Sequence, residues 1–162
     1  VGYLPGELAL MEDMSGIGFL RMMAGIRNMK DTSRMEELIQ LFSLDAGQKI
    51  RRMSKGTKQK VGLVCALMHS PKILLLDEPT ASLDADNEAM VQKALDEISQ
   101  ERTVVMIAHR LKTVRGAEQI LVLQDGRIVQ KGTHDQLAGQ KGLYARLWEL
   151  QNQAGSYTFK QS

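Results

Sequence analysis

The sequence predicts an α/β protein with a mainly parallel sheet, an antiparallel hairpin near its C-terminal end and a helical first half. Three observations carry this prediction. Apolar residues recur at helical spacing through most of residues 7–68. Two apolar, strand-like runs, 73–76 and 103–107, flank another helical pattern, and strand, helix and strand in succession form a parallel pair. Asp125-Gly126 then separates two further apolar runs, as in a two-residue hairpin turn.

Before residue 70 the pattern predicts one short strand and then helices. Residues 1–4 are strand-like, and Pro5-Gly6 ends them because neither residue continues a strand. Helical apolar spacing follows in three segments, 7–27, 33–42 and 59–68. A basic connector, 49–60, leads into the last of them.

After Pro71 strands and helices alternate. The apolar strand 73–76 is followed by a helix whose apolar face runs from Met90 to Ile98, and then by the β-branched strand 103–107. Three further elements complete the chain: hairpin strands 119–123 and 127–131, and an amphipathic helix over 142–153 with Leu143, Leu147 and Leu150 on one stripe beside Tyr144 and Trp148.

Composition narrows the class of protein. The 162 residues are 43% hydrophobic and 25% charged, which is typical of a soluble globular domain. A formal net charge of +2 creates no overall field for nucleic acid or an anionic membrane. The basic residues of 49–60 lack interleaved aromatics, so we expect a solvated face and no nucleic-acid partner.

The cysteine content and the apolar runs indicate where in the cell the protein is expected. The single cysteine, Cys65, lies among apolar residues and is expected to be a small core residue in a reducing, cytosolic compartment. No apolar run approaches the roughly 20 residues that span a bilayer. The first residues show no basic patch followed by an apolar stretch, so we expect no signal peptide.

Asp77 and Glu78 end the apolar strand 73–76 and are the first candidates for chemistry. The carboxyl ends of parallel strands are where α/β sheets bind ligands. In phosphoryl transfer to water, one acid can hold Mg²⁺ while its neighbour orients and polarises the attacking water. Asp77 suits the first role and Glu78 the second. The alternative is that the two acids cap a turn before Pro79.

Further motifs surround this pair. Met53-Ser54-Lys55-Gly56-Thr57 precedes it, Ser82-Leu83-Asp84 follows it, and Ala108-His109-Arg110 comes after the next strand. Ser54 lies 23 residues before Asp77, Asp84 lies 7 after Asp77, and His109 lies 31 after Glu78. In order and spacing, the chain resembles the ATP-binding cassette (ABC) transporter ATPases over residues 1–150, with signature motif, Walker B strand, D-loop and switch histidine in sequence.

The resemblance implies a role for each matched residue. Ser54 and the backbone N–H of Gly56 would face the γ-phosphate of an ATP held mainly by an opposite cassette, with Lys55, Thr57 and Asp84 as further nucleotide-binding positions. A glycine and a helix N-terminus suit this role because they let backbone N–H groups approach an anion closely. His109 would contact the ATP of its own cassette, and Asp77 and Glu78 would act on Mg²⁺ and water.

Several positions depart from the family pattern. Lys55 replaces the first glycine of the usual signature and Thr57 its glutamine, whereas Ser54 and Gly56 remain. Gly6 stands where the Q-loop glutamine is expected, and Glu7 is the candidate replacement. Residues 3–7 and 54–59 resemble cassettes that are separate subunits, and 103–134 and 145–150 resemble cassettes fused to a transmembrane domain, which leaves a natural or engineered mosaic open.

The phosphate loop, Gly-x-x-x-x-Gly-Lys-[Ser/Thr], does not occur in the 162 residues. The resemblance therefore implies a truncated P-loop NTPase fold. We expect residues 1–70 to form the Q-loop region and a helical signature subdomain, and 71–162 to form part of the core α/β subdomain with the C-terminal helix.

Two functions remain open at this point. The first is part of a transport ATPase, inactive alone, that uses ATP and Mg²⁺ with a second cassette and a transmembrane domain at the cytoplasmic face of a membrane. The second is a non-catalytic relic or interaction module. In this family a strand lies between those ending at His109 and at Leu123, so strand 103–107 would have an open edge. We therefore expect self-association or strand swapping unless the two flanking strands pair directly.

Overall fold

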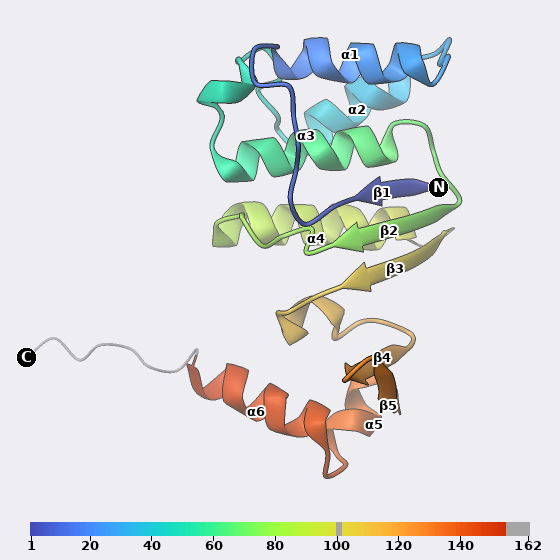
Figure 1. The fold of residues 1–162 in the computed structure, drawn as a ribbon, viewed down its shortest axis with the longest axis vertical. Coiled ribbons are helices and arrows are strands. Elements are labelled where there is room, and N and C mark those ends of the chain that lie inside the picture. Colours follow the sequence, from blue (N-terminus) through green and yellow to red (C-terminus); the bar gives the residue numbers. More distant parts are fainter. Residues whose placement is uncertain (100–101, 155–162) are drawn as a thin grey trace, which may run out of the picture. The chain divides into compact units, whose positions relative to one another are not determined.

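A computed structural model describes residues 1–99 and 102–154 (Figure 1). The chain forms two compact units, Val1–Ile107 and Ala108–Ser162, the second described as far as residue 154. No helix within the described residues combines the length and the apolar character that crossing a membrane requires. The boundary at residue 70 that the sequence suggested for two subdomains stays a prediction.

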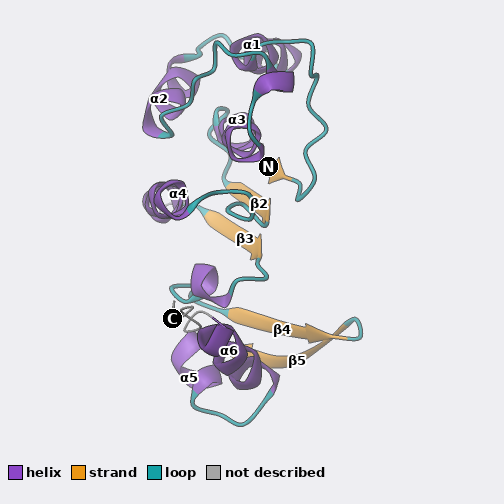
Figure 2. Ribbon diagram, turned by 90° about the vertical axis from the view of Figure 1, so that its left-hand side faces the viewer, coloured by secondary structure: helices purple, strands orange, loops and turns teal. Residues whose placement is uncertain are grey.

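A three-stranded parallel sheet organises the first unit. Its strands β1 (Gly2–Leu4), β2 (Ile73–Asp77) and β3 (Thr103–Ile107) lie in the order β1-β2-β3. Tyr3 pairs with Leu75 and Leu75 with Val105, so the three strands are in register across the sheet. Helix α4 (Ala85–Ser99) connects β2 to β3 and runs along one face of the sheet (Figures 1 and 2). The predicted strand, helix and strand unit is confirmed.

Helices α1 (Gly16–Ile26), α2 (Ser33–Leu41) and α3 (Lys55–Leu67) pack above the sheet in Figure 1, with a short 3-10 turn at Ile50–Arg52. Helix α3 lies centrally and contacts α1, α2 and β1. It is therefore buried on several sides, with side chains of Val61, Leu63, Val64 and Leu67 in the core. A helix that is apolar nearly all round is expected where neighbours cover it.

The predicted helix over residues 7–27 is too long. Helix α1 begins only at Gly16, because the Ser15 side chain accepts a hydrogen bond from the Gly18 N–H at 3.2 Å and caps the helix there. The preceding residues form a loop, which an ion pair between Lys58 and Glu12 at 2.8 Å ties to α3. Apolar spacing continues through this loop and does not reveal the cap.

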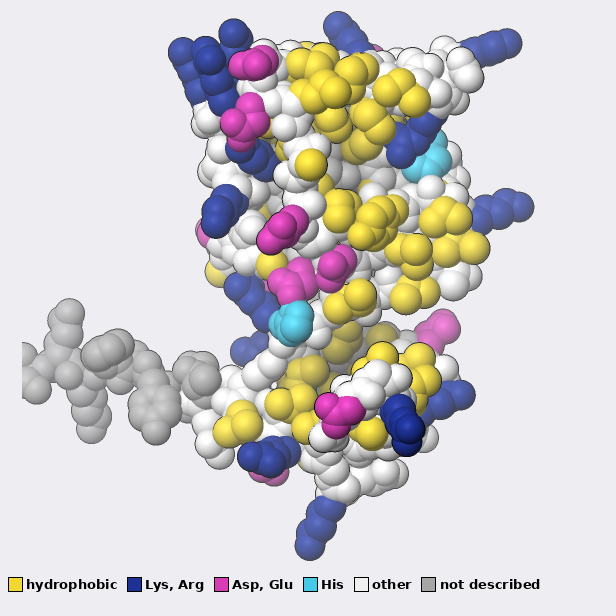
Figure 3. Space-filling view, in the orientation of Figure 1, with side chains coloured by type: hydrophobic (Ala, Val, Ile, Leu, Met, Phe, Trp, Pro, Cys, Tyr) yellow, Lys and Arg dark blue, Asp and Glu magenta, His cyan; other side chains and the backbone are white. Residues whose placement is uncertain are grey.

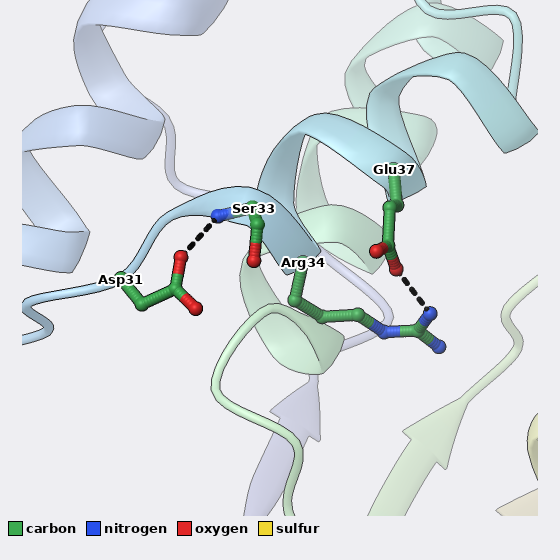
Figure 4. Close-up of polar contacts among 4 residues, drawn as sticks. All are labelled: Asp31, Ser33, Arg34 and Glu37. Carbon is green, nitrogen blue, oxygen red and sulfur yellow. Dashed lines mark hydrogen bonds and ion pairs between the residues drawn. The ribbon is translucent and has the colours of Figure 1, made fainter.

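Helix α2 shows a similar local control of its start (Figure 4). The carboxylate of Asp31 accepts a hydrogen bond from the Ser33 N–H at 2.8 Å, which lowers the pKa of Asp31. Thr32, at the capping position, makes no side-chain cap of its own. One turn further, Arg34 pairs with Glu37 at 2.9 Å on the surface.

The second unit is built on the predicted hairpin. Strands β4 (Ile120–Gln124) and β5 (Arg127–Gly132) pair antiparallel, and Asp125 and Gly126 have φ of 51° and 74°. Both turn residues thus have the positive φ that the Asp-Gly signal predicts. A 3-10 turn (Leu111–Val114) precedes the hairpin, and helices α5 (His134–Ala138) and α6 (Leu143–Ala154) follow it.

Helix α6 docks as its amphipathic pattern predicts, but of the expected leucine stripe only Leu143 packs against the core. Tyr144 is fully buried, and its hydroxyl lies 2.9 Å from His134 Nδ1. The His134 ring also packs edge-on against Trp148, with centroids 4.5 Å apart. Leu147 and Leu150 remain exposed. An aromatic contact with α5, invisible to helical periodicity, decides which side of α6 faces inward.

Candidate functional site

The carboxyl end of β2 carries the predicted acidic pair. Asp77 is the last residue of the strand, and Glu78 follows it with φ of 46°. A left-handed conformation costs a residue with a side chain roughly 1–2 kcal/mol, so the surroundings must hold it. The Glu78 N–H donates to Ile107 O at 3.0 Å, and its carbonyl accepts from the Ala81 N–H at 3.2 Å. Both acidic residues are half-buried.

Gly6, at the position of the expected glutamine, lies against Asp77. An atom at the Cβ position of Gly6 would be 3.0 Å from Asp77 Oδ2. A side chain at position 6 would therefore meet this carboxylate directly. With glycine there, the Asp77 carboxylate keeps space on that side. Glu7 is exposed and lines a cavity of about 220 Å³ with residues of β1, α1 and α3.

Helix α3 begins at the signature motif. Ser54 caps it: its Oγ accepts from the Thr57 N–H at 3.1 Å and lies 2.9 Å from Thr57 Oγ1. Ser54 and Lys55 are exposed, and Gly56 and Thr57 are half-buried. A helix start presents backbone N–H groups and a positive dipole end, which together favour an anion. This end of α3 can therefore receive a phosphate from outside the chain.

Asp84 caps helix α4. Its Oδ1 accepts from the backbone N–H of Asn87 at 2.9 Å, and the Asn87 side chain donates to Oδ1 and Oδ2 at 2.9 and 2.8 Å. These hydrogen bonds, with a smaller contribution from the Lys60 charge, hold the pKa of Asp84 below its ordinary value. Asp84 is thus kept ionised and in a fixed orientation at the start of α4.

The start of α3 packs directly on the loop before Asp84. A Cβ on Gly56 would lie 3.1 Å from Ser82 O and 3.3 Å from a methyl group of Leu83. A side chain at position 56 would crowd both atoms, and glycine avoids this crowding where the two backbones approach closely. The signature motif and the D-loop, which are 26 residues apart from Gly56 to Ser82, therefore form one contact.

His109 belongs to the second unit. Its carbonyl accepts a hydrogen bond from Gln151 Nε2 at 2.6 Å, and Gln151 Oε1 accepts from the Leu111 N–H at 2.8 Å. Helix α6 thereby fixes the backbone at His109. The contacts that join Gly56, Glu78 and Asp84 all lie within the first unit.

Sequence reasoning missed three residues that connect these motifs: Gln59, Lys60 and Asn87. It placed Lys60 on a solvated basic face, and this is wrong, because Lys60 is only 7% exposed. Its Nζ donates to Asn87 Oδ1 at 2.5 Å. Two polar residues at the start of an apolar helix were the available signal. Cys65, predicted in the core, is half-buried and accepts from Arg27 Nη1 at 3.5 Å.

The residues present fit Mg²⁺ only if a bound nucleotide supplies most of the ligands. Within residues 1–99 and 102–154, no three His, Cys, Asp or Glu side chains gather as a metal site. Mg²⁺ commonly takes one or two protein carboxylates and completes its shell with phosphate and water. Asp77 is such a carboxylate. Most of the coordination would have to come from the nucleotide.

Comparisons with known proteins agree with this picture. Residues 1–81 match the family described as "ABC transporter". Leptomycin B resistance protein pmd1 of Schizosaccharomyces pombe is 48% identical over 114 residues, and "ATP-binding cassette sub-family B member 5" of Mus musculus is 46% identical over 106. These alignments span 70% and 65% of this chain, and 8% of each relative.

A solved structure extends the similarity to the fold. The structure of a bacterial Atm1-family ABC exporter with ATP bound matches with a TM-score of 0.81 and 29% identity, over 93% of this chain and 28% of that chain. The mainly parallel sheet with an antiparallel hairpin is thus the fold of an ABC exporter cassette. A family match to half of the chain and relatives aligned over about two thirds of it agree, and the chain belongs to the ABC transporter family.

Proposed function

We propose that the chain supplies the signature, Walker B and D-loop parts of the ATPase domain of an ABC exporter. In this proposal it acts with ATP and Mg²⁺, a second cassette and a transmembrane domain, at the cytoplasmic face of a membrane. The names of two similar proteins, the leptomycin B resistance protein and the bacterial ABC exporter, support export over import. Residues 1–162 contain no phosphate loop, so in this proposal residues outside this sequence hold the phosphates of the nucleotide.

Each candidate residue takes a role in this proposal. Ser54 and the Gly56 N–H contact the γ-phosphate of an ATP held by the opposite cassette, with Lys55 and Thr57 beside them. Asp84 faces the same partner. Asp77 would hold Mg²⁺ and Glu78 would polarise the attacking water, while His109 would contact a nucleotide bound on its own side. Mg²⁺, when bound, neutralises charge that develops on the phosphates.

One observation carries the proposal: the close packing of Gly56 on Ser82 and Leu83. It joins the exposed, capped start of α3 to the loop of Asp84, so two elements that would face a partner's nucleotide are held as one surface. A relic with no nucleotide partner has no need of an exposed helix start fixed in this way.

Mixing tests the proposal. The 162-residue chain is combined with an ABC cassette that has its own phosphate loop, and sedimentation is compared with and without Mg²⁺-ATP. We expect association only with nucleotide, and Ser54→Arg should abolish it because the larger side chain fills the phosphate position. Ser33→Arg, at the exposed start of α2, is the matched control and should associate normally.

Two outcomes would favour the relic or interaction module instead. One is association that ignores nucleotide, and the other is nucleotide-dependent association that survives Ser54→Arg. The chain alone should hydrolyse ATP no faster than background, because positioning is most of phosphoryl-transfer catalysis.

A further inference from the structure

Helix α3 buries two consecutive polar residues, Gln59 and Lys60, with exposed fractions of 4% and 7%. Burying an ammonium group is unfavourable unless hydrogen bonds or opposite charges compensate for the lost hydration. Burying an amide has a smaller but still unfavourable free energy. Burial lowers the pKa of Lys60 in agreement with this cost. The residues that follow them in α3, such as Val61 and Leu63, are apolar and fully buried. Core packing therefore does not account for Gln59 and Lys60.

Lys60 is the first member of a hydrogen-bonded relay that ends at Asp84. Its Nζ donates to Asn87 Oδ1 at 2.5 Å, and Asn87 Nδ2 donates to both carboxylate oxygens of Asp84 at 2.9 and 2.8 Å. An ammonium can only donate and an ionised carboxylate can only accept. The amide between them consequently has one orientation, because rotation by half a turn would oppose donor to donor and acceptor to acceptor.

Gln59 makes the parallel connection to the other loop. Its Nε2 donates to the carbonyl oxygen of Glu78 at 3.3 Å, the same oxygen that accepts from the Ala81 N–H. Glu78 is in the left-handed region, at φ of 46°. A buried donor on its carbonyl helps to hold this unfavourable conformation, since a rotated peptide would lose the bond.

We infer that Gln59 and Lys60 are positioning residues that fix the loop from Glu78 to Asp84 to helix α3, which Ser54 caps. Lys60 orients Asn87, which orients Asp84, and Gln59 holds the backbone of Glu78. The signature motif and the loop from Glu78 to Asp84 consequently move as one body. The placement stands on the contacts alone, and only its consequence for nucleotide chemistry rests on the proposed function.

Hydrogen exchange of the full 162-residue chain tests the placement without nucleotide. The reporters are the hydrogen-bonded amides of Ala81, Leu83 and Asn87. In Lys60→Met we expect Leu83 and Asn87 to exchange about tenfold faster, because an anchoring hydrogen bond is lost. The urea midpoint should not fall, since methionine fills the same space without a buried charge. Lys60→Arg should restore protection because it still donates to Asn87.

Matched variants separate positioning from simple structural support. Lys93→Met, an exposed lysine of α4, should leave all three reporters unchanged. Gln59→Leu should affect Ala81 more than Asn87. The inference is overturned if Lys60→Met leaves Leu83 and Asn87 protected, or if it speeds exchange equally in the β4 and β5 strands while lowering the urea midpoint.

The functional consequence has a separate readout. In the mixing assay with Mg²⁺-ATP, Lys60→Met should weaken association about tenfold, the loss expected for a hydrogen bond to a charged group, and Lys60→Arg should stay near the parent chain. If the parent chain fails to associate at all, the proposed function is wrong and the exchange result still decides the placement. If Lys60→Met exchanges faster but associates normally, the positioning does not serve the nucleotide site.

Discussion

Single residues connect the motifs of this chain in ways that sequence patterns indicate only in part. The sequence alone suggested Ser54, Asp77, Glu78 and Asp84 as candidate site residues, because each belongs to a short motif with fixed spacing. Lys60 was misplaced on a solvated face because its partner, Asn87, lies 27 residues further on and has no motif of its own. Buried polar partners become visible only when the tertiary structure brings them together.

Asp84 gives a prediction at this scale. The Asn87 hydrogen bonds lower its pKa, so the ionised carboxylate supports folding above the ordinary Asp pKa of about 3.9, and the support is lost as pH falls through the lowered value. NMR titration should find Asp84 below that ordinary value. Asn87→Ala should raise the pKa, whereas Gln92→Ala, further along α4, should not. An unchanged pKa in Asn87→Ala would contradict the capping geometry.

At the scale of elements, the apolar periodicity predicted which helices and strands form, but it did not predict where each of them begins and ends. Strand 103–107 and the hairpin turn were placed correctly because β-branched runs and Asp-Gly are strong local signals. The start of α1 was missed by nine residues because the Ser15 cap, not apolar spacing, sets it. The buried side of α6 was missed because His134, on another helix, selects it.

Gly56 and Gly25 make a matched pair for testing the contact between α3 and the D-loop. Gly56→Ala would force a Cβ against Ser82 O and Leu83, and should destabilise the chain by about 1–3 kcal/mol. Gly25→Ala in α1 meets no atom within 4 Å and should stabilise it by up to about 1 kcal/mol through helix propensity. Urea denaturation measures both. If Gly56→Ala were as stable as the parent chain, the loop at Ser82 and Leu83 would be able to shift away from the added methyl group at no cost.

The contact of α5 with α6 gives a second prediction at this scale. Tyr144→Phe removes the hydroxyl that lies 2.9 Å from His134 Nδ1 and leaves a buried ring nitrogen without that partner. The expected loss is about 1–3 kcal/mol. Tyr3→Phe, at an exposed site, should change stability by less than about 0.5 kcal/mol. Calorimetry that finds the two variants alike would show that the hydrogen bond is not formed in solution.

At the scale of the whole molecule, one face of the three-stranded sheet exposes apolar side chains. Parallel sheets normally have both faces covered, whereas here large apolar side chains on alternate strand positions stay exposed. Figure 3 shows the apolar surface on this side. The exposed residues are Tyr3, Ile73, Leu75, Val105 and Ile107. Strand β3 is also the edge of its sheet, and β4 pairs with β5 in a separate sheet.

This exposed face predicts self-association of the 162-residue chain, by burial of the face or by pairing of β3 edges. Light scattering should give a mass above that of one chain. Val105→Lys together with Ile107→Lys should reduce it, while Leu123→Lys, an exposed residue of the hairpin, should not. A strictly monomeric mass with protected amides across 103–107 would show that the edge is satisfied within one chain.

The central claim is that this chain presents the start of α3 and the D-loop to a nucleotide held by another cassette. Paramagnetic broadening by Mn²⁺-ATP tests it most directly. The ¹⁵N-labelled chain is mixed with an unlabelled phosphate-loop cassette whose catalytic glutamate is replaced by glutamine, so that ATP persists. We predict that the amides of Ser54, Gly56 and Asp84 lose intensity only when the cassette is present. Equal broadening without the cassette, or none at these amides with it, would contradict the claim.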